Sequence, residues 1–433
     1  MQIFNIKNID DKLVLFGQNK SLVDFFKKNN EFDKNIIEET TSIIEDVKIN
    51  KDKALIKYSN LFDKSLFKNS DDLFVSKEEI DEAVLCSSPL LRESLEVAFA
   101  RIIAYHKNQL PKDNIYQDDV GVTLGNLWKT LDSVGIYAPS GSAAYPSSVL
   151  MCAGPAIVSN VKEITLCTPT NMGKVNPAIL LAANICGINK IYKIGGAQAI
   201  SAMAYGTESI KRVAKIVGPG NIYVAMAKKI LFGQVGIDMI AGPTDLTIIC
   251  DENTKPDWIA SDAISQLEHG KDSKVFIITK NIDFAKAIID SINEITLTLS
   301  RKDIIAESLK NSAIFLVDDF EYSSQIVDII APEHLEILIE DESLINKINN
   351  AGAIFYGKYT PESIGDYIAG PSHVLPTEST ARFSSGLSVY DFLKRVSYIS
   401  CDKNSFAQIA NQTSIIAESE GLDGHKKSID IRK

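Results

Sequence analysis

Gln266 and His269 stand three residues apart in the stretch 258–272, where apolar residues recur at helical spacing. That spacing places both side chains on one polar face of a predicted helix, about 5–6 Å apart between Cβ atoms. Gly270 follows directly, and helices commonly end at such a glycine. A polar helical face is most often a solvated surface. An amide oxygen and an imidazole nitrogen could instead bind a divalent metal ion together.

Four of the five histidines of the chain stand near a carboxylate or amide side chain. A lone histidine is more often structural than catalytic, and we interpret His106, in the middle of a predicted helix, in that way. Imidazoles with carboxylate or amide oxygens are nevertheless the ligand set expected for Zn²⁺ and similar ions. Besides Gln266 with His269, the sets are Glu333 with His334, Asp366 with His373, and Glu420 with His425.

Glu333 and His334 are adjacent, at the point where a predicted helical run gives way to the alternating strand 335–339. Functional groups of α/β proteins gather at such junctions. A carboxylate and an imidazole side by side could supply two proton-transfer groups of different basicity. A simple polar turn is an equally good local interpretation.

Three glycine-containing turns follow predicted strands in residues 133–231. Gly218-Pro-Gly-Asn221 precedes a helix whose first N–H groups are free, which is a plausible anion site. Tyr137-Ala-Pro-Ser-Gly141 and Gly195-Gly-Ala-Gln198 occupy comparable positions. The dinucleotide fingerprint G-x-G-x-x-G is missing, so the pattern alone supports a nucleotide cleft only weakly.

The elements that must position these residues alternate between strand and helix. Residues 1–110 are predicted to be helical, and from Ser133 strand, glycine turn and helix repeat, as in parallel α/β sheets. After Gly233 the pattern resumes in a second α/β domain. Beyond Gly386 the chain is predicted to be a tail, with a helix over 405–420, that is too small to bury a core alone.

Composition narrows the class of protein. A chain of 433 residues is expected to form two or more domains, and its net charge of −11 argues against a nucleic-acid surface. The most apolar run, 178–188, is too short to span a membrane. The six cysteines are scattered without a C-x-x-C pair. We therefore expect a cytoplasmic protein with reduced cysteines.

Taken together, these stretches resemble the histidinol dehydrogenase family over nearly the whole chain. The resemblance is carried by Val134-Gly-Ile-Tyr-Ala-Pro139, Tyr145-Pro-Ser-Ser-Val-Leu-Met151, Gly195-Gly-Ala-Gln-Ala199, Val217-Gly-Pro-Gly-Asn221, Ile237-Asp-Met-Ile-Ala-Gly-Pro243, Gln266-Leu-Glu-His-Gly270, Ala331-Pro-Glu-His-Leu335, Gly365-Asp-Tyr367, His373-Val-Leu-Pro-Thr377, Ser385-Gly-Leu-Ser388 and Ala417-Glu-Ser-Glu-Gly-Leu422. So many ordered matches with sensible spacing make a chance resemblance very improbable.

The resemblance implies that L-histidinol is oxidised to L-histidine by two NAD⁺, through an aldehyde and its hydrate. It implies one Zn²⁺ per subunit, with Gln266, His269, Asp366 and His425 as ligands. His334 would take the alcohol proton, and Glu333 would activate water. The implied substrate contacts are Thr244, Gln266, His269, His334, Asp366, Glu420 and His425, with His373 nearby. The implied NAD contacts are Tyr137, Gln198 and Asn221.

The resemblance also implies two incomplete Rossmann-like α/β domains with a helical N-terminal region and a small C-terminal extension. We expect residues 1–30 to be an N-terminal extension. Residues 31–132 and 240–385 would form the domain with the metal and acid/base residues, and 133–239 the NAD-side domain. The tail 386–433 would cross to the partner of a homodimer, so that each active site is shared.

The chain departs from the family pattern at two positions. Ser140 replaces a usual glycine, which could alter the turn beside the cofactor, and Asp245 replaces a usual glutamate after Thr244. Two other functions compete with the dehydrogenase. A zinc hydrolase would use Glu333 to activate a metal-bound water, but it leaves the glycine turns unexplained. A non-enzymatic metal- or nucleotide-binding module would not need Glu333 and His334 together.

Overall fold

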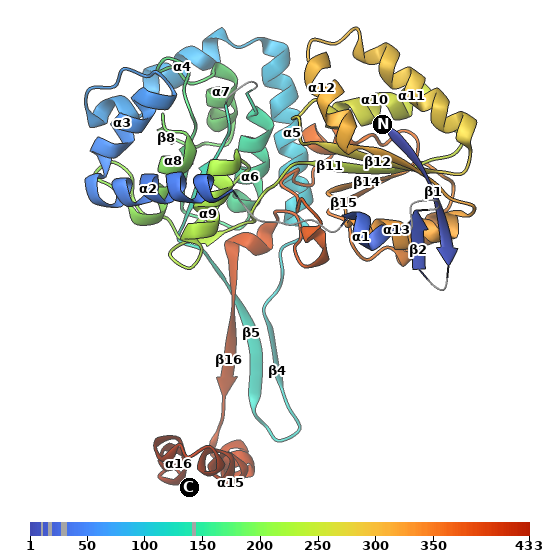
Figure 1. Cartoon of the computed structure of the whole chain (residues 1–433). Helices are drawn as coiled ribbons and strands as arrows, with labels where there is room; N and C mark the ends of the chain where they lie inside the picture. The colour runs from blue at the N-terminus through green and yellow to red at the C-terminus, as the bar shows by residue number, and fades with distance from the viewer. Residues whose placement is uncertain (10–11, 16–19, 27–32, 141–143) are drawn as a thin grey trace.

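The computed structural model describes residues 1–9, 12–15, 20–26, 33–140 and 144–433. Two α/β domains lie side by side, and a long arm projects from between them (Figure 1). Mixed α/β structure with parallel sheets confirms the predicted fold class. Among the described residues, no helix combines the length and hydropathy that a membrane span requires.

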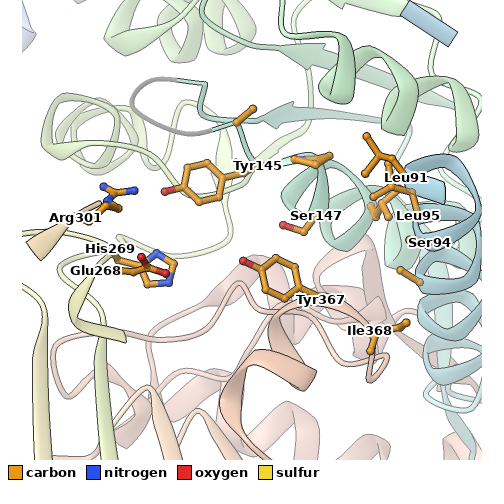
Figure 2. A pocket seen from close by; sticks show the side chains of 14 residues that line it. Leu91, Ser94, Leu95, Tyr145, Ser147, Glu268, His269, Arg301, Tyr367 and Ile368 are labelled. Carbon is orange, nitrogen blue, oxygen red and sulfur yellow. The ribbon is translucent and has the colours of Figure 1, made fainter. Parts of the chain in front are cut away.

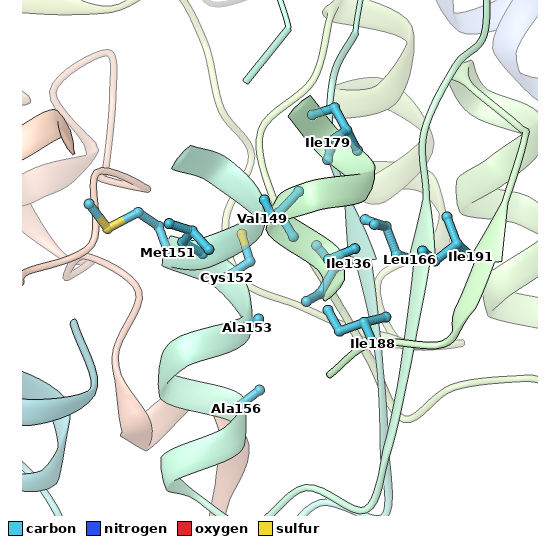
Figure 3. Packing of buried hydrophobic residues seen from close by; sticks show 14 of the residues in the cluster. Ile136, Val149, Met151, Cys152, Ala153, Ala156, Leu166, Ile179, Ile188 and Ile191 are labelled. Carbon is cyan, nitrogen blue, oxygen red and sulfur yellow. The ribbon is translucent and has the colours of Figure 1, made fainter. Parts of the chain in front are cut away.

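The first domain contains a five-stranded parallel sheet in the order β10-β9-β6-β7-β8. Its strands are β6 (Ser133–Tyr137), β7 (Glu163–Cys167), β8 (Lys190–Tyr192), β9 (Lys215–Val217) and β10 (Gly236–Ile237), and its connecting helices are α6 (Pro146–Val158), α7 (Pro177–Ile185), α8 (Gly196–Tyr205) and α9 (Ile222–Leu231). Figure 3 shows Ile136 and Leu166 of the sheet packing with Val149 of α6 and Ile179 of α7. The sheet is buried because helices cover both of its faces, which is typical of parallel sheets.

The N-terminal helices also belong to this first domain, which corrects the predicted division of the chain. They are α2 (Lys34–Asn50), α3 (Asp52–Phe62), α4 (Lys77–Cys86) and α5 (Pro89–Lys107). Helix α2 packs on α8 and α9, α4 on α7, and α5 on α6. Their apolar residues, including Ile44, Leu55 and Ile102, are buried in the cores of this domain. The prediction that residues 31–132 join 240–385 is therefore wrong for these helices. The predicted capping box of Ser76 and Glu79 at the start of α4 is confirmed.

The second domain contains an eight-stranded sheet in the order β15-β14-β11-β12-β13-β1-β2-β3. Its parallel strands are β11 (Asp245–Ile249), β12 (Lys274–Thr279), β13 (Ala313–Leu316), β14 (His334–Ile337) and β15 (Ala353–Tyr356). Its helices are α10 (Pro256–Leu267), α11 (Ile282–Thr296), α12 (Lys302–Ser308), α13 (Ser323–Ile330) and α14 (Glu362–Tyr367). Short 3-10 helices lie in connections of the chain: η1 (Ser70–Leu73), η2 (Leu309–Asn311), η3 (Phe320–Tyr322), η4 (Glu342–Lys347), η5 (Thr380–Arg382) and η6 (Val389–Phe392).

The beginning of the chain completes this second sheet. Strand β1 (Gln2–Ile9) pairs in parallel with β13, and β2 (Lys12–Leu15) and β3 (Lys20–Ser21) follow it antiparallel, before the short helix α1 (Leu22–Phe26). The prediction of helix throughout residues 1–110 is therefore wrong at its start. Phe4 and Ile6 are buried in this core, so the segment is part of the second domain rather than a separate extension.

The arm is a three-stranded antiparallel sheet in the order β16-β5-β4. It consists of β4 (Asn114–Gln117), β5 (Thr123–Thr130) and β16 (Leu393–Ser400), and it carries α15 (Lys403–Ser419) and α16 (Asp423–Asp430). Strand β16 pairs with β5 along its whole length, which places the two terminal helices at the far end of the arm (Figure 1). The predicted helix over 405–420 is confirmed by α15. The two terminal helices are thus held away from both domains, whereas Leu387 and Phe392 at the start of the tail are buried in the core of the first domain.

Candidate active site

Glu333 and His334 lie side by side at the amino end of β14. They follow Ala331, whose left-handed backbone (φ 49°) ends α13, and both are buried, with exposed fractions of 6% and 3%. The Thr244 hydroxyl donates a hydrogen bond to Oε2 of Glu333. Nδ1 of His334 lies 3.9 Å from the same oxygen, and its Nε2 lies 3.6 Å from Oδ1 of Asp366. The pair therefore forms one buried cluster with Thr244 and Asp366.

The surroundings of Glu333 and His334 raise the pKa of both side chains. Burial raises the pKa of Glu333 to about 7, although the neighbouring His334 opposes that change. For His334, burial disfavours the charged ring, but the carboxylates of Glu362 and Glu333 outweigh it and raise its pKa well above the ordinary value. Perturbed groups of this kind concentrate in active sites because proton transfer needs pKa values near the working pH.

Three side chains next to this pair could bind a metal ion. His269, Glu362 and Asp366 each offer a ligand atom, and these atoms all lie within 4.8 Å of one another. Glu362 was not identified from the sequence. The signal that could have found it is its spacing from Asp366: the two stand at i and i+4 on α14, and therefore on one helical face.

Gln266 reaches the same cluster from α10. Its side chain is fully buried, and the amide orientation that satisfies its neighbours donates to Oε1 of Glu362 at 2.6 Å and accepts from the backbone N–H of Asp245 at 3.1 Å. His269 follows just after the end of α10 and remains exposed. The surrounding protein nevertheless lowers its pKa, mainly by desolvation, which favours the neutral ring that binds metals.

A cavity of about 460 Å³ opens beside His269, between the two domains. Tyr145 and Ser147 from the start of α6 line one side, and His269 and Tyr367 line the other (Figure 2). The cavity therefore faces the loop after β6 of the first domain and the donor group of the second. A small molecule in this cavity would contact both domains.

The three residues predicted to contact NAD gather at the carboxyl edge of the five-stranded sheet. Tyr137 ends β6, Gln198 lies in the first turn of α8, and Asn221 caps α9 by accepting from two backbone N–H groups. The hydroxyl of Tyr137 accepts from the N–H of Gly196 at 3.1 Å. Oε1 of Gln198 is buried without a hydrogen-bond partner among the described residues. Gly141, in the first predicted turn, lies outside the described residues.

His373 connects the two domains. Its Nδ1 lies 3.0 Å from the carbonyl oxygen of Asp366, and its Nε2 lies 3.0 Å from the hydroxyl of Ser148 in α6. His373 therefore lies directly beside Asp366, and its expected place near the substrate stays a prediction. Ser140, one of the two departures from the family pattern, ends the described part of the β6–α6 loop.

Glu420 and His425 are not brought to this site within the chain. Glu420 caps the end of α15 and His425 lies in α16, and both are exposed at the far end of the arm. Figure 1 shows these helices at the far end of the arm, well separated from α10. If these two residues contribute to a site of this kind, they must contribute to that of another copy.

Comparison with known proteins agrees with this architecture. The family model described as histidinol dehydrogenase matches residues 26–433. A histidinol dehydrogenase of Agrobacterium fabrum is 46% identical over 94% of this chain and 95% of its own length, and one of Rhizobium meliloti is 46% identical over 90% of each. The crystal structure of a histidinol dehydrogenase from Elizabethkingia anophelis superimposes with a TM-score of 0.93 at 35% identity, covering 100% of this chain and 98% of that one.

The fold and these relatives define an oxidoreductase built from two α/β domains. The match of the family model, together with relatives that align over nearly their whole length, then specifies the family. The chain belongs to the histidinol dehydrogenase family.

Proposed function

We propose that this chain oxidises L-histidinol to L-histidine with two NAD⁺, as the last step of histidine biosynthesis. The observation that carries the proposal is the buried Glu333–His334 pair next to a group of side chains that could hold a metal ion. One member of that group, His269, lines a cavity that faces the other domain. The family membership supports the same reaction. A hydrolase would need the acid/base pair and the metal but would not need the sheet edge that gathers Tyr137, Gln198 and Asn221.

The residues present fit a zinc ion. An imidazole and two carboxylates whose ligand atoms lie within 4.8 Å of one another form a donor set that Zn²⁺ accepts. We propose His269 and Asp366 as ligands, joined by Gln266 and by His425 of a second copy. Zinc would supply positive charge that binds and polarises the substrate. Glu362 holds the Gln266 amide by hydrogen bonds, and it is either a further ligand or the group that orients one.

In the first oxidation, His334 accepts the alcohol proton while hydride leaves the substrate carbon for NAD⁺. Nδ1 lies 3.4 Å from the carbonyl oxygen of Asp245, which favours a hydrogen on that nitrogen. Nε2 is buried without a hydrogen-bond partner among the described residues and faces the donor group, so it is the atom that takes the proton. A cation at Asp366 would offset the negative charge that raises the pKa of His334, and it would thus favour the neutral ring.

In the second oxidation, Glu333 accepts a proton from the water that adds to the aldehyde, and the hydrate then loses hydride to a second NAD⁺. Burial places the pKa of Glu333 at about 7, so the carboxylate can both take and release a proton near neutral pH. Thr244 donates to its Oε2 and so fixes the direction of the carboxylate. We propose that Thr244 and Glu420 also contact the substrate.

We propose that NAD binds at the carboxyl edge of β6 and β9, in contact with Tyr137, Gln198 and Asn221. Strand β6 is followed by β7 and β8 on one side and by β9 and β10 on the other, so the strand order reverses between β6 and β9. Ligands of open α/β sheets bind in the crevice at such a reversal. On this basis residues 133–239 form the cofactor side and residues 240–385 supply the metal and acid/base groups.

We propose that two copies exchange their arms in a homodimer of the cytoplasm. The arm exposes apolar side chains that an isolated chain would leave in water, including Ile399 at 68% and Ile431 at 64% exposure. Contiguous exposed apolar surface commonly marks a protein interface. Exchange would bring Glu420 and His425 to the partner's donor group and so complete each site.

Incubation of the protein with L-histidinol and excess NAD⁺ tests the reaction. We expect two NADH for each histidinol consumed, because the alcohol and the hydrated aldehyde each lose one hydride. NADH is followed by its absorbance, and histidine by chromatography. If zinc-loaded protein forms no NADH, the proposed dehydrogenase reaction is contradicted and the hydrolase function is favoured.

Mixing two inactive variants tests the exchange of arms. We expect Glu333→Ala and His425→Ala, each inactive alone, to recover about a quarter of wild-type activity after complete subunit exchange. In half of the resulting dimers, one site combines an intact Glu333 with the intact tail of the other chain. A mixture of Glu333→Ala and His334→Asn is the matched control, because both residues lie in the same body and no site is restored. Recovery in neither mixture would show that each chain is self-contained.

A further inference from the structure

Lys228 and Asp238 form an ion pair in the interior of the first domain, away from the acid/base cluster. The exposed fractions of their side chains are 2% and 0%. Lys228 lies in α9, the helix that follows β9 in the chain. Asp238 follows β10, the strand that lies beside β9 in the sheet. The pair therefore joins these two segments. Neither residue takes part in the chemistry described above.

Both side chains bind the same residue, Gly218, from opposite ends of its backbone. Nζ of Lys228 donates to the carbonyl oxygen of Gly218 at 2.9 Å, and the N–H of Gly218 donates to Oδ2 of Asp238 at 2.7 Å. The other carboxylate oxygen accepts from the N–H of Met239 at 2.7 Å. The ion pair therefore fixes both peptide groups of Gly218.

The backbone at Gly218 has a conformation and a close neighbour that only glycine tolerates. Its φ is +112°, which side chains disfavour, and a Cβ there would overlap the carbonyl oxygen of Tyr137. It opens the turn Gly218–Asn221, which leads into α9, and Asn221 caps that helix with hydrogen bonds of 3.1 Å to the N–H groups of Tyr223 and Val224. The clamped residue thus lies where the ends of β6 and β9 meet, at the reversal of the strand order.

Stability alone does not account for a buried ion pair at this place. Removing two charges from water is costly, and apolar residues of similar volume often stabilise a fold equally well or better. A charged pair does offer directed hydrogen bonds, and here each of the two charged side chains makes one to Gly218 of this turn. The geometry therefore assigns the pair to holding this turn rather than to the core as a whole.

We propose that Lys228 and Asp238 are positioning residues for the nicotinamide cofactor, which set the Gly218–Asn221 turn at the distance from Tyr137 that cofactor binding needs. This inference rests on the proposed function, because it takes the turn to face NAD. The two residues act through the turn and do not touch the reacting atoms. Their loss should weaken NAD binding and leave substrate binding and zinc unaffected.

The test compares the KM for NAD⁺ with the KM for histidinol in three variants. Asp238→Asn and Lys228→Met each remove one charge, and the double variant Lys228→Met/Asp238→Leu leaves no charge unpaired and keeps the site apolar. We expect the KM for NAD⁺ to rise about tenfold to a hundredfold, because misplacement of a binding group by about 1 Å has effects of that size. The KM for histidinol should stay within about twofold of the wild-type value.

Lys215→Met is the matched control. Lys215 lies at the opposite end of β9 and pairs with Asp391 at 3.0 Å. Its loss should lower the melting temperature without moving the KM for NAD⁺. Should the single variants fail to fold, the double variant decides: a folded double variant with the wild-type KM for NAD⁺ would overturn the proposal. A wild-type protein that forms no NADH would instead contradict the proposed function before any variant is compared.

Discussion

Replacing His334 with asparagine is expected to lower kcat by about 10²–10⁴-fold while the zinc content stays unchanged. Asparagine is similar in reach and can still donate to the carbonyl oxygen of Asp245, which lies 3.4 Å from Nδ1 of His334. It cannot take a proton at the position of Nε2, which faces the donor group. Hydride transfer would then leave the alcohol proton without an acceptor. Single-turnover formation of NADH and metal analysis measure the two effects separately.

His106→Asn is the control for this variant. His106 is also a fully buried histidine, but it lies in α5, pairs with Gln109 and does not line the cavity. Its loss should lower the melting temperature and leave kcat within about twofold of the wild-type value, since substitutions distant from the chemistry act through stability. Loss of zinc from His334→Asn would mean that His334 is a ligand and not the proton acceptor.

Removing the metal is expected to abolish NADH formation, and adding Zn²⁺ back should restore it. His269, Glu362 and Asp366 hold their ligand atoms close together. Without a cation, the negative charge of the nearby carboxylates, including Glu362 and Asp366, raises the pKa of His334 and favours its protonated form. A protonated His334 cannot accept the alcohol proton. Asp366→Asn should have the same effect permanently, with bound zinc falling from about one ion per chain towards none. Chelation followed by metal analysis and an activity assay checks both expectations.

Glu268→Gln is the matched control for Asp366→Asn. Glu268 is the immediate neighbour of His269 and lines the same cavity, but it does not belong to the donor group. It should keep its zinc and most of its activity. A metal-free protein that still forms NADH at the wild-type rate would refute the metal-dependent reaction and leave the donor group with a structural role.

Some parts of the site were accessible to sequence analysis because they are local. The spacing of Gln266 and His269 predicts two neighbours on a helix. The helix α10 is present and includes Gln266, but it ends at Leu267, so His269 lies in the turn just beyond it. Glu333 and His334 are adjacent in the chain, so no fold is needed to place them together. The glycine turns were visible because each directly follows a strand of its own βαβ unit.

Other parts were missed because they depend on contacts between distant segments. Glu362 joins His269 only because α14 packs on α10. The helices of residues 34–107 carry apolar faces that could cover either sheet, and only the packing shows that they cover the first. Strand β1 joins the second sheet beside β13, which lies about 300 residues further along the chain. No local sequence pattern predicts this pairing.

The sequence by itself determined which residues could do chemistry and which of them are neighbours on one helix or strand, since local periodicity fixes that spacing. The tertiary structure decided where the groups meet. Glu333 and His334 lie at the amino end of β14, and the cavity beside His269 is lined from the other domain by Tyr145 and Ser147, which follow β6. It also decided that Glu420 and His425 lie on α15 and α16, at the far end of the arm and far from Glu333 and His334 of the same chain. These positions depend on which apolar faces pack together, and those faces lie far apart in the sequence. No short stretch of sequence is enough to predict which faces will pair.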